Sequence, residues 1–295
     1  MKKASIFQGY ALVIASAFLF GCMPLITKNI YADGVNALSV VFLRGVLSIP
    51  VLGLLALRQD GTLRIEKKAL PSIAAIGLSG CCITPLLLFA SYHYIASGTA
   101  TVLHFIYPAV VLLISSILFR KKPPVVGLIA VGICLIGICL FYDPTQAFSW
   151  RGATLALVSG VAYATYVVLL AAFKYKKIYG FTLSFYIAII CTVCLLVVCL
   201  ALGQLTFPAT FKGWLWAFLL AIVVNVGAVV LFQQGTLVIG GERAAILGAV
   251  EPITGVVIGI IAFNETVNIQ TIFGCFLVVA ATVLIAVADM RKSKQ

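Results

Sequence analysis

Charged residues are scarce in this chain of 295 residues, where they make up 9% of the sequence and only eight of them are Asp or Glu. Soluble proteins carry about 25% charged residues, whereas this chain is 63% hydrophobic with a mean hydropathy of +1.19. Histidine is also rare, with two residues, and the connecting segments contain no HExxH motif and no Gly-rich phosphate loop. These absences exclude an ordinary soluble protein and argue against an enzyme.

The nine cysteines do not form a disulfide or metal-binding pattern. All of them lie inside long apolar segments, where a thiol behaves as a small apolar packing residue. Cys191 and Cys194 form a CxxC pair, but no second pair and no neighbouring His accompanies it. We therefore expect no metal and no cofactor.

Long apolar runs dominate the sequence. A membrane-spanning helix needs about 20 mostly apolar residues, and this chain has room for ten such helices with short connections. The predicted spans are residues 9–30, 36–56, 70–94, 100–119, 125–142, 152–173, 181–202, 214–239, 244–263 and 269–287. The predicted fold class is an all-α integral membrane protein.

The basic residues follow the predicted topology. Of the 20 Lys and Arg residues, sixteen fall in the connections and termini of one membrane face, three fall on the other face and one lies inside a span. This is the positive-inside asymmetry of helical membrane proteins, and it places both termini in the cytoplasm. The net charge of +12 is then explained by topology, so we expect a lipid bilayer as the environment and no nucleic-acid partner.

The sequence contains an internal repeat. Residues 9–142 and 152–288 each hold five predicted spans, and at a shift of 144 residues Pro108 falls on Pro252. Several further matches occur in the same order at nearly the same shift. Because each half has an odd number of spans, the second half enters the membrane with the opposite orientation. An inverted repeat of this kind lets a site between the halves open alternately to either side, which favours a carrier.

Four short motifs carry a resemblance to a known family. They are Phe20-Gly21, Leu43-Arg44, the small-residue run 96–100 leading to Tyr107-Pro108, and Gly241-Glu242-Arg243-Ala244-Ala245 leading to Glu251-Pro252. Over essentially its whole length the chain resembles the EamA-like group of the drug/metabolite transporter superfamily. The resemblance implies ten spans in two five-span repeats, and secondary transport of small metabolites across the inner membrane, often export, through a central cavity. It does not fix a substrate.

Two ionisable side chains lie deep inside predicted spans, at a cost of about 2.5 to 3.5 kcal/mol each on insertion scales. Arg44 and Glu251 each lie about 12 Å from a membrane surface at 1.5 Å per residue, so both can reach one cavity near the midplane. They form either a structural salt bridge or a functional pair. In the functional hypothesis, Glu251 binds a proton or a substrate amine, while Arg44 holds a carboxylate or gates the cavity. The functional hypothesis is favoured for Glu251 and the structural one for Arg44, whose counterpart in the second half is Ile189.

The other candidate substrate-binding residues are polar and aromatic side chains inside the spans. They are Phe20, His104, Tyr107, Tyr163, Tyr166, Asn225, Gln233 and Gln234. Core packing of the rings and hydrogen bonding between helices through the amides are the structural alternatives. Pro108 and Pro252 predict helix kinks, because proline removes one backbone donor from the helix.

The sequence therefore predicts a secondary active transporter of a small metabolite, with export as the expected direction and proton coupling through Glu251 as the hypothesis. One acid, one base and many rings favour an amino-acid-like, amine or neutral aromatic solute over a dianion. The alternatives are a membrane-embedded lipid-modifying enzyme, or a carrier of the same superfamily for nucleotides or sugars. The sequence leaves the coupling ion and the oligomeric state open.

Overall fold

The computed structural model describes residues 6–95, 97–120, 123–140, 149–175, 178, 180–248, 250–251, 253–254, 257–258 and 269–292. Every regular element in these ranges is a helix. Within them, the helical segments long and apolar enough to cross a membrane are Ile6–Tyr31, Ala37–Gln59, Lys67–Ser91, Trp150–Ala171, Gly180–Leu202 and Phe211–Ile239, and shorter apolar helices cover Tyr107–Leu118, Val125–Gly137 and Ile272–Ala281. The prediction of an all-helical integral membrane protein is confirmed.

Several of the long segments are composed of shorter helices in series. The first half contains α1 (Ile6–Gly21), α2 (Met23–Tyr31), α3 (Ala37–Leu55), η1 (Ala56–Asp60), η2 (Lys67–Ala69), α4 (Leu70–Gly77), η3 (Leu78–Ile83), α5 (Thr84–Ser91), α6 (Ser97–His104), α7 (Tyr107–Leu118) and α8 (Val125–Cys139). The second half contains α9 (Trp150–Ala171), α10 (Gly180–Leu202), α11 (Phe211–Leu220), η4 (Ala221–Val229), α12 (Val230–Ile239), α13 (Gly241–Gly248) and α15 (Ile269–Lys292).

The predicted span 100–119 is not one continuous helix. A two-residue turn at Phe105 and Ile106 separates α6 from α7, and Pro108 lies in the first turn of α7. Proline has no N–H to donate to the carbonyl four residues earlier, which here is that of His104, so the helix breaks at this point. Of the predicted span 244–263, the structure describes α13 and a few following residues, and Pro252 lies outside the described residues.

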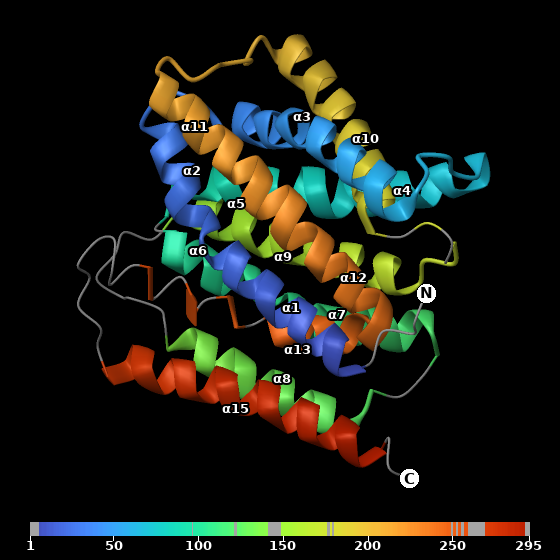
Figure 1. Ribbon diagram of the computed structural model, residues 1–295. Coiled ribbons are helices and arrows are strands. Elements are labelled where there is room, and N and C mark those ends of the chain that lie inside the picture. The colour runs from blue at the N-terminus through green and yellow to red at the C-terminus, as the bar shows by residue number, and fades with distance from the viewer. Residues whose placement is uncertain are drawn as a thin grey trace.

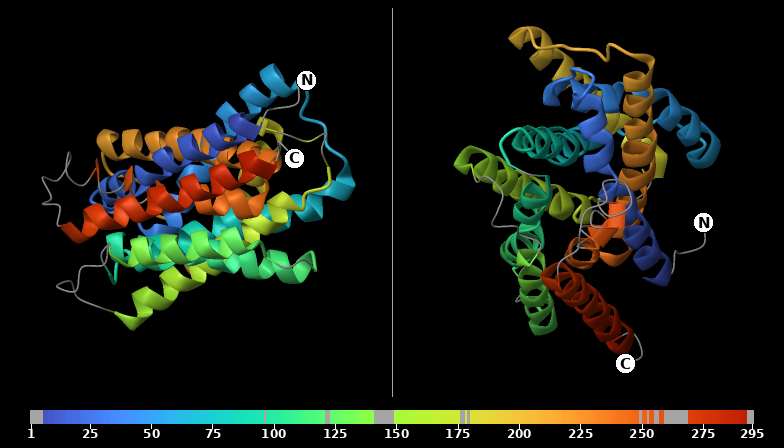
Figure 2. Two further views of the ribbon diagram at one scale, coloured as in Figure 1. Left: turned by 90° about the horizontal axis from the view of Figure 1, so that it is seen from below. Right: turned by 90° about the vertical axis from the view of Figure 1, so that its left-hand side faces the viewer.

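The helices pack in pairs that join the two halves of the chain. Helix α3 packs on α10, α8 on α15, α1 on α12, α5 on α9, and α7 on α13. The α3–α10 pair lies along one side of the bundle and the α8–α15 pair along the opposite side (Figure 1). The beginning of α1 and the end of α15 lie at the same end of the bundle (Figure 2).

Hydrogen bonds tie both ends of the antiparallel α3–α10 pair. At the start of α3, Asn36 caps the helix by accepting from the Ser39 N–H at 2.8 Å, and its Nδ2 donates to the Gln204 carbonyl at 2.6 Å. At the other end, the Tyr186 hydroxyl in α10 donates to the Leu63 carbonyl at 2.8 Å. These bonds hold α3 and α10 together as one unit.

A close backbone approach joins α9 to α6. An ideal Cβ built on Gly160 in α9 lies 2.5 Å from the carbonyl oxygen of His104, which is shorter than any normal contact. The absence of a side chain at Gly160 is therefore what lets α9 approach the end of α6.

We expect Gly160→Ala to destabilise the protein by about 1 to 3 kcal/mol through overpacking. The matched control is Gly132→Ala in α8, because nothing lies within 4 Å of a Cβ built on Gly132. Thermal unfolding of the two variants in detergent measures the difference. Equal unfolding midpoints for both variants would contradict the close approach.

Asp33 links the turn after α2 to the start of α11. Its Oδ2 accepts from the Thr210 backbone N–H at 3.0 Å and its Oδ1 from the Thr210 hydroxyl at 2.8 Å. These two hydrogen bonds favour the carboxylate and hold the pKa of Asp33 below its ordinary value of 3.8. A lowered pKa in the folded state stabilises the protein above the ordinary pKa, and this stabilisation is lost as the pH falls through the folded pKa.

We expect Asp33→Asn to lower the unfolding midpoint at pH 7 relative to the wild type. The difference should shrink as the pH is lowered below the ordinary aspartate value of 3.8, because the wild-type carboxylate then becomes protonated. Thermal unfolding across pH 3 to 7 measures it, with the exposed residue Glu66 as the site of the control variant Glu66→Gln. A difference that stays constant down to the lowest pH would rule out the charged link.

Candidate functional site

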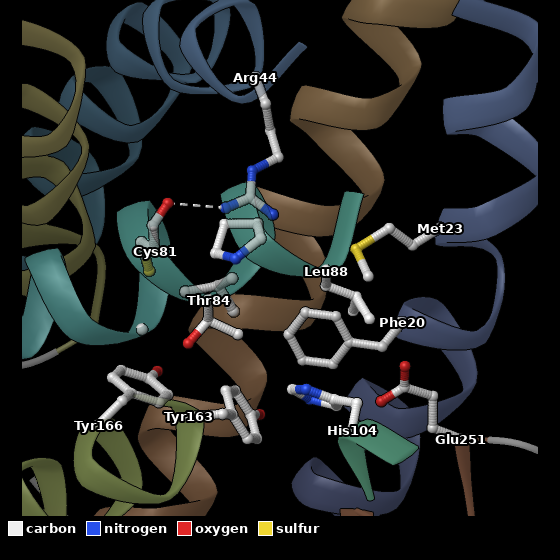
Figure 3. Close-up of a pocket in the computed structure, with 13 residues that line it drawn as sticks. Phe20, Met23, Arg44, Cys81, Thr84, Leu88, His104, Tyr163, Tyr166 and Glu251 are labelled. Carbon is white, nitrogen blue, oxygen red and sulfur yellow. Dashed lines mark hydrogen bonds between the residues drawn. The ribbon is translucent and has the colours of Figure 1, made fainter. Parts of the chain in front are cut away.

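A cavity lies inside the bundle. The residues predicted from the sequence that line it are Phe20, Arg44, His104, Tyr163, Tyr166 and Glu251. They come from α1, α3, α6, α9 and the segment after α13, so both halves of the chain contribute. Arg44 enters from one side, and His104, Tyr163 and Glu251 lie on the other (Figure 3).

Arg44 is fixed by backbone groups of neighbouring helices. Its side chain is only 4% exposed, and its Nη2 donates to the Cys81 carbonyl in η3 at 3.1 Å. Pro85, four residues after Cys81, has no N–H for this carbonyl, which leaves the oxygen free for Arg44. The sequence analysis did not identify Cys81 or Pro85, although Thr84-Pro85 inside an apolar segment was an available signal for a freed carbonyl.

Asn225 in η4 fixes Arg44 from the second half of the chain. Its Nδ2 donates to the Arg44 backbone carbonyl at 3.0 Å and to the Ser48 hydroxyl at 3.2 Å. Asn225 lines a second, smaller cavity behind Arg44, between α3, α10 and η4. Arg44 and Cys81 line both cavities, so the guanidinium lies at their junction.

Glu251 lies across the first cavity from Arg44 (Figure 3). No ion pair joins the two side chains in the described part of the chain, and the Nε of Arg44 has no hydrogen-bond partner there. A Cβ built on Gly21 at the end of α1 lies 2.9 Å from the Glu251 carbonyl oxygen, so the lack of a side chain at Gly21 positions the Glu251 backbone against α1. The direct salt bridge considered from the sequence is not formed.

His104 presents one ring nitrogen to a serine. Its Nδ1 lies 2.8 Å from the Ser159 hydroxyl oxygen, and that hydroxyl donates its proton to the Ala156 carbonyl at 2.6 Å. When the hydroxyl donates to Ala156 it accepts from His104, and this arrangement corresponds to the tautomer with the proton on Nδ1. In the neutral imidazole, Nε2 is therefore an acceptor.

Tyr163 is the centre of an aromatic cluster. Its ring centroid lies 4.8 Å from that of Tyr107, 5.4 Å from those of His104 and Tyr166, and 5.7 Å from that of Phe232. Tyr107 is 1% exposed and lies behind the lining residues. Phe232 in α12 was missed by the sequence analysis, because nothing in the sequence distinguishes it from the other apolar residues of its span.

The remaining candidates lie in α12. The Gln233 Oε1 accepts from the Ser184 hydroxyl in α10 at 2.7 Å, while its Nε2 has no partner among the described residues. Gln233 thus joins α12 to α10. Gln234 is half-buried and lines neither of the two cavities.

Comparison with known proteins identifies the family. The model of the EamA-like transporter family matches residues 7–142 and 150–287. The chain belongs to the EamA-like transporter family. Among curated relatives of this EamA protein is an uncharacterized transporter of Archaeoglobus fulgidus, 29% identical over 280 residues that cover 94% of this chain and 95% of the relative.

Two further comparisons agree with this family. An uncharacterized transporter of Synechocystis is 30% identical over 209 residues, which cover 68% of this chain and 62% of the relative. A solved crystal structure superposes on the EamA chain with a TM-score of 0.74 at 17% identity, covering 97% of this chain and 99% of that one. At this identity the structural likeness shows the fold alone.

We expect Ser159→Ala to cost about 1 to 3 kcal/mol of stability, because it leaves the buried Nδ1–H of His104 without an acceptor. The control is Thr165→Ala in the same helix, where the hydroxyl donates only to the Val161 carbonyl one turn earlier. Thermal unfolding in detergent compares them. A Ser159→Ala midpoint as high as that of Thr165→Ala would contradict a stabilising hydrogen bond between His104 and Ser159.

Proposed function

We propose that this EamA-family membrane transporter carries a small amino-acid-like, amine or neutral aromatic metabolite through the first cavity, with export as its direction and a proton on Glu251 as the coupling ion. The observation that carries the proposal is that Glu251 and Arg44 line one aromatic cavity without pairing with each other. A structural salt bridge between the two side chains would explain their presence in the membrane, but this bridge is not formed. Ionisable side chains inside a membrane usually mark the path of an ion or substrate.

The lining of the cavity supports the class of solute. Phe20, Tyr163 and Tyr166 supply aromatic surface, and the Nε2 of a neutral His104 supplies an acceptor near Glu251 (Figure 3). An ammonium group or an N–H donor fits the Glu251 side of this cavity. Arg44 is the only Lys or Arg among the described residues that line it, which disfavours dianionic substrates such as phosphate esters.

The helix pairing supports alternating access between two inverted repeats of five spans. If the halves are exchanged, α3 and α10 replace each other, as do α8 and α15. The α1–α12 pair likewise takes the place of the α9–α5 pair. A pairing scheme that survives this exchange is what two pseudo-symmetric halves produce, and such halves open a site between them alternately to each side.

The proposed membrane is the cytoplasmic (inner) membrane, with both termini inside. The positive-inside distribution of Lys and Arg supports this orientation. The first residues of α1 and the last residues of α15 lie at one end of the bundle, which also supports this orientation. Glu251 would then exchange a proton with each side in turn.

A ligand screen on purified protein tests the solute class. Amino acids, polyamines, nucleobases and quaternary amines are added separately in a thermal-shift assay with wild-type protein and Glu251→Gln. A ligand at 100 times its Kd stabilises a protein by about 2.7 kcal/mol, which this assay resolves. We expect a stabilising amine or zwitterion whose effect is lost in Glu251→Gln.

The ligand found in this way is then followed in proteoliposomes. We expect an imposed pH gradient to drive its uptake by the wild type, and Glu251→Gln to abolish this uptake while the protein still inserts. The control is Glu66→Gln, which changes an exposed carboxylate outside the spans and should transport as the wild type does. Unchanged flux in Glu251→Gln would make Glu251 a structural residue and overturn the proposal.

A further inference from the structure

The second cavity is lined by a buried cation, Arg44, for which the described residues provide no counterion. Arg44 separates it from the first cavity, and the polar residues that line it besides Arg44 are Cys81, Cys191, Ser184 and Asn225. None of them carries a negative charge. Glu251 is the only acidic residue among the described residues that line the first cavity, and it forms no ion pair with Arg44.

An uncompensated charge at this depth is expensive. A charged group removed from water costs far more than a polar one unless it is paired, and a residue inside a membrane helix has little water to replace that loss. Arg44 is 4% exposed, and the described structure gives it one hydrogen bond, from Nη2 to the Cys81 carbonyl. Its Nε lacks a partner, so part of the guanidinium fork remains available to a ligand.

A bound water does not remove this cost. The Nε of Arg44 and the Oδ1 of Asn225 both lack a partner among the described residues, and both residues line the second cavity. Water would satisfy both hydrogen-bonding groups but leave the positive charge without a counterion. An anion neutralises the charge and accepts from the guanidinium at the same time.

We propose that Arg44 binds a small monovalent anion, either a halide ion or the carboxylate of the transported solute, at the junction of the two cavities. Among the described lining residues of the two cavities, Arg44 is the one cation, so a dianion would leave one negative charge uncompensated. The Cys81 carbonyl and the Asn225 amide are positioning groups, because they fix the side chain and the backbone of Arg44. The halide form goes beyond the proposed function, and the carboxylate form rests on it.

The test is anion binding by the purified full-length protein. Sodium chloride, bromide or acetate replaces sodium gluconate at constant ionic strength, and the unfolding midpoint is followed. We expect a saturable rise in the wild type and none in Arg44→Gln. The control Arg58→Gln removes an exposed cation outside the cavities and should respond as the wild type does.

Arg44→Lys refines the result. It keeps the charge but loses the planar fork of donors, so we expect the anion effect to persist with a half-saturating concentration about tenfold higher. A response to anions in Arg44→Gln equal to that of the wild type would overturn the proposal. So would the absence of a saturable response to all three anions in the wild type.

A direct measurement covers the case in which the Arg44 variants do not fold. Crystals of the wild-type protein grown or soaked in bromide should show an anomalous peak beside the Arg44 guanidinium. Peaks confined to surface Lys and Arg residues would indicate an adventitious ion only and would overturn the site.

Two aromatic probes separate the sources of the anion. Phenylalanine and phenethylamine differ by the carboxylate, and both are tested in chloride-free buffer. If phenylalanine stabilises the protein, competes with chloride and loses its effect in Arg44→Gln while phenethylamine keeps its own, the carboxylate is the ligand. If chloride acts independently of phenylalanine, or neither aromatic compound acts, the ligand is the halide.

Failure of the anion site and failure of the proposed function give different results. If the wild type shows no anion response but its transport depends on Glu251, the anion site at Arg44 is overturned and the proposed function stands. If the anion response depends on Arg44 but transport is unchanged in Glu251→Gln, the proposed proton coupling is overturned and the anion site stands.

Discussion

The cost of an unsatisfied polar group in hydrocarbon is the constraint on which the centre of this protein depends. A backbone carbonyl or a charged side chain that faces no water must find a partner inside the protein. Pro85 removes the partner of the Cys81 carbonyl, and Arg44 supplies a replacement. Asn225 then binds the Arg44 carbonyl from the second half. The contacts of Arg44 with Cys81 and Asn225 thus join three helical segments, α3, η3 and η4.

The helices around the first cavity form two groups: the α3–α10 pair, which carries Arg44, and the helices that carry the aromatic and acidic residues. The α3–α10 pair is tied by hydrogen bonds at both ends, and Arg44 extends from this pair toward the first cavity. The aromatic and acidic side of the cavity comes from α1, α6, α9 and the segment after α13. Movement of the second group against the first would change access to the cavity without disturbing Arg44. A fixed cation is suited to this arrangement, because it provides the same binding group in each state.

Hydropathy was sufficient to predict the helical membrane fold, because a span must be apolar over most of its length. Depth along the helix also predicted that Arg44 and Glu251 reach one cavity, and both line it. Whether they touch depends on helix tilt and rotation, which packing decides and residue counting does not. The break before α7 and the freed Cys81 carbonyl depend on backbone hydrogen bonds, for which proline is the only signal in the sequence. Phe232 joins the aromatic cluster through packing alone, so the sequence contains no sign of its position.

The separation of the two charges has a consequence for the proposed transport. A buried pair would hold Glu251 ionised beside Arg44 and leave neither group free for a ligand. Placed on opposite sides of the cavity, the two groups act independently: a proton and a substrate amine compete for the Glu251 carboxylate, while Arg44 keeps its charge. Proton binding then raises the net charge of the cavity by one, which favours release of a cationic group and retention of an anionic one. In the proposed mechanism, exchange of a proton for an ammonium group follows from competition at one carboxylate, and the distance between Glu251 and Arg44 is what permits it.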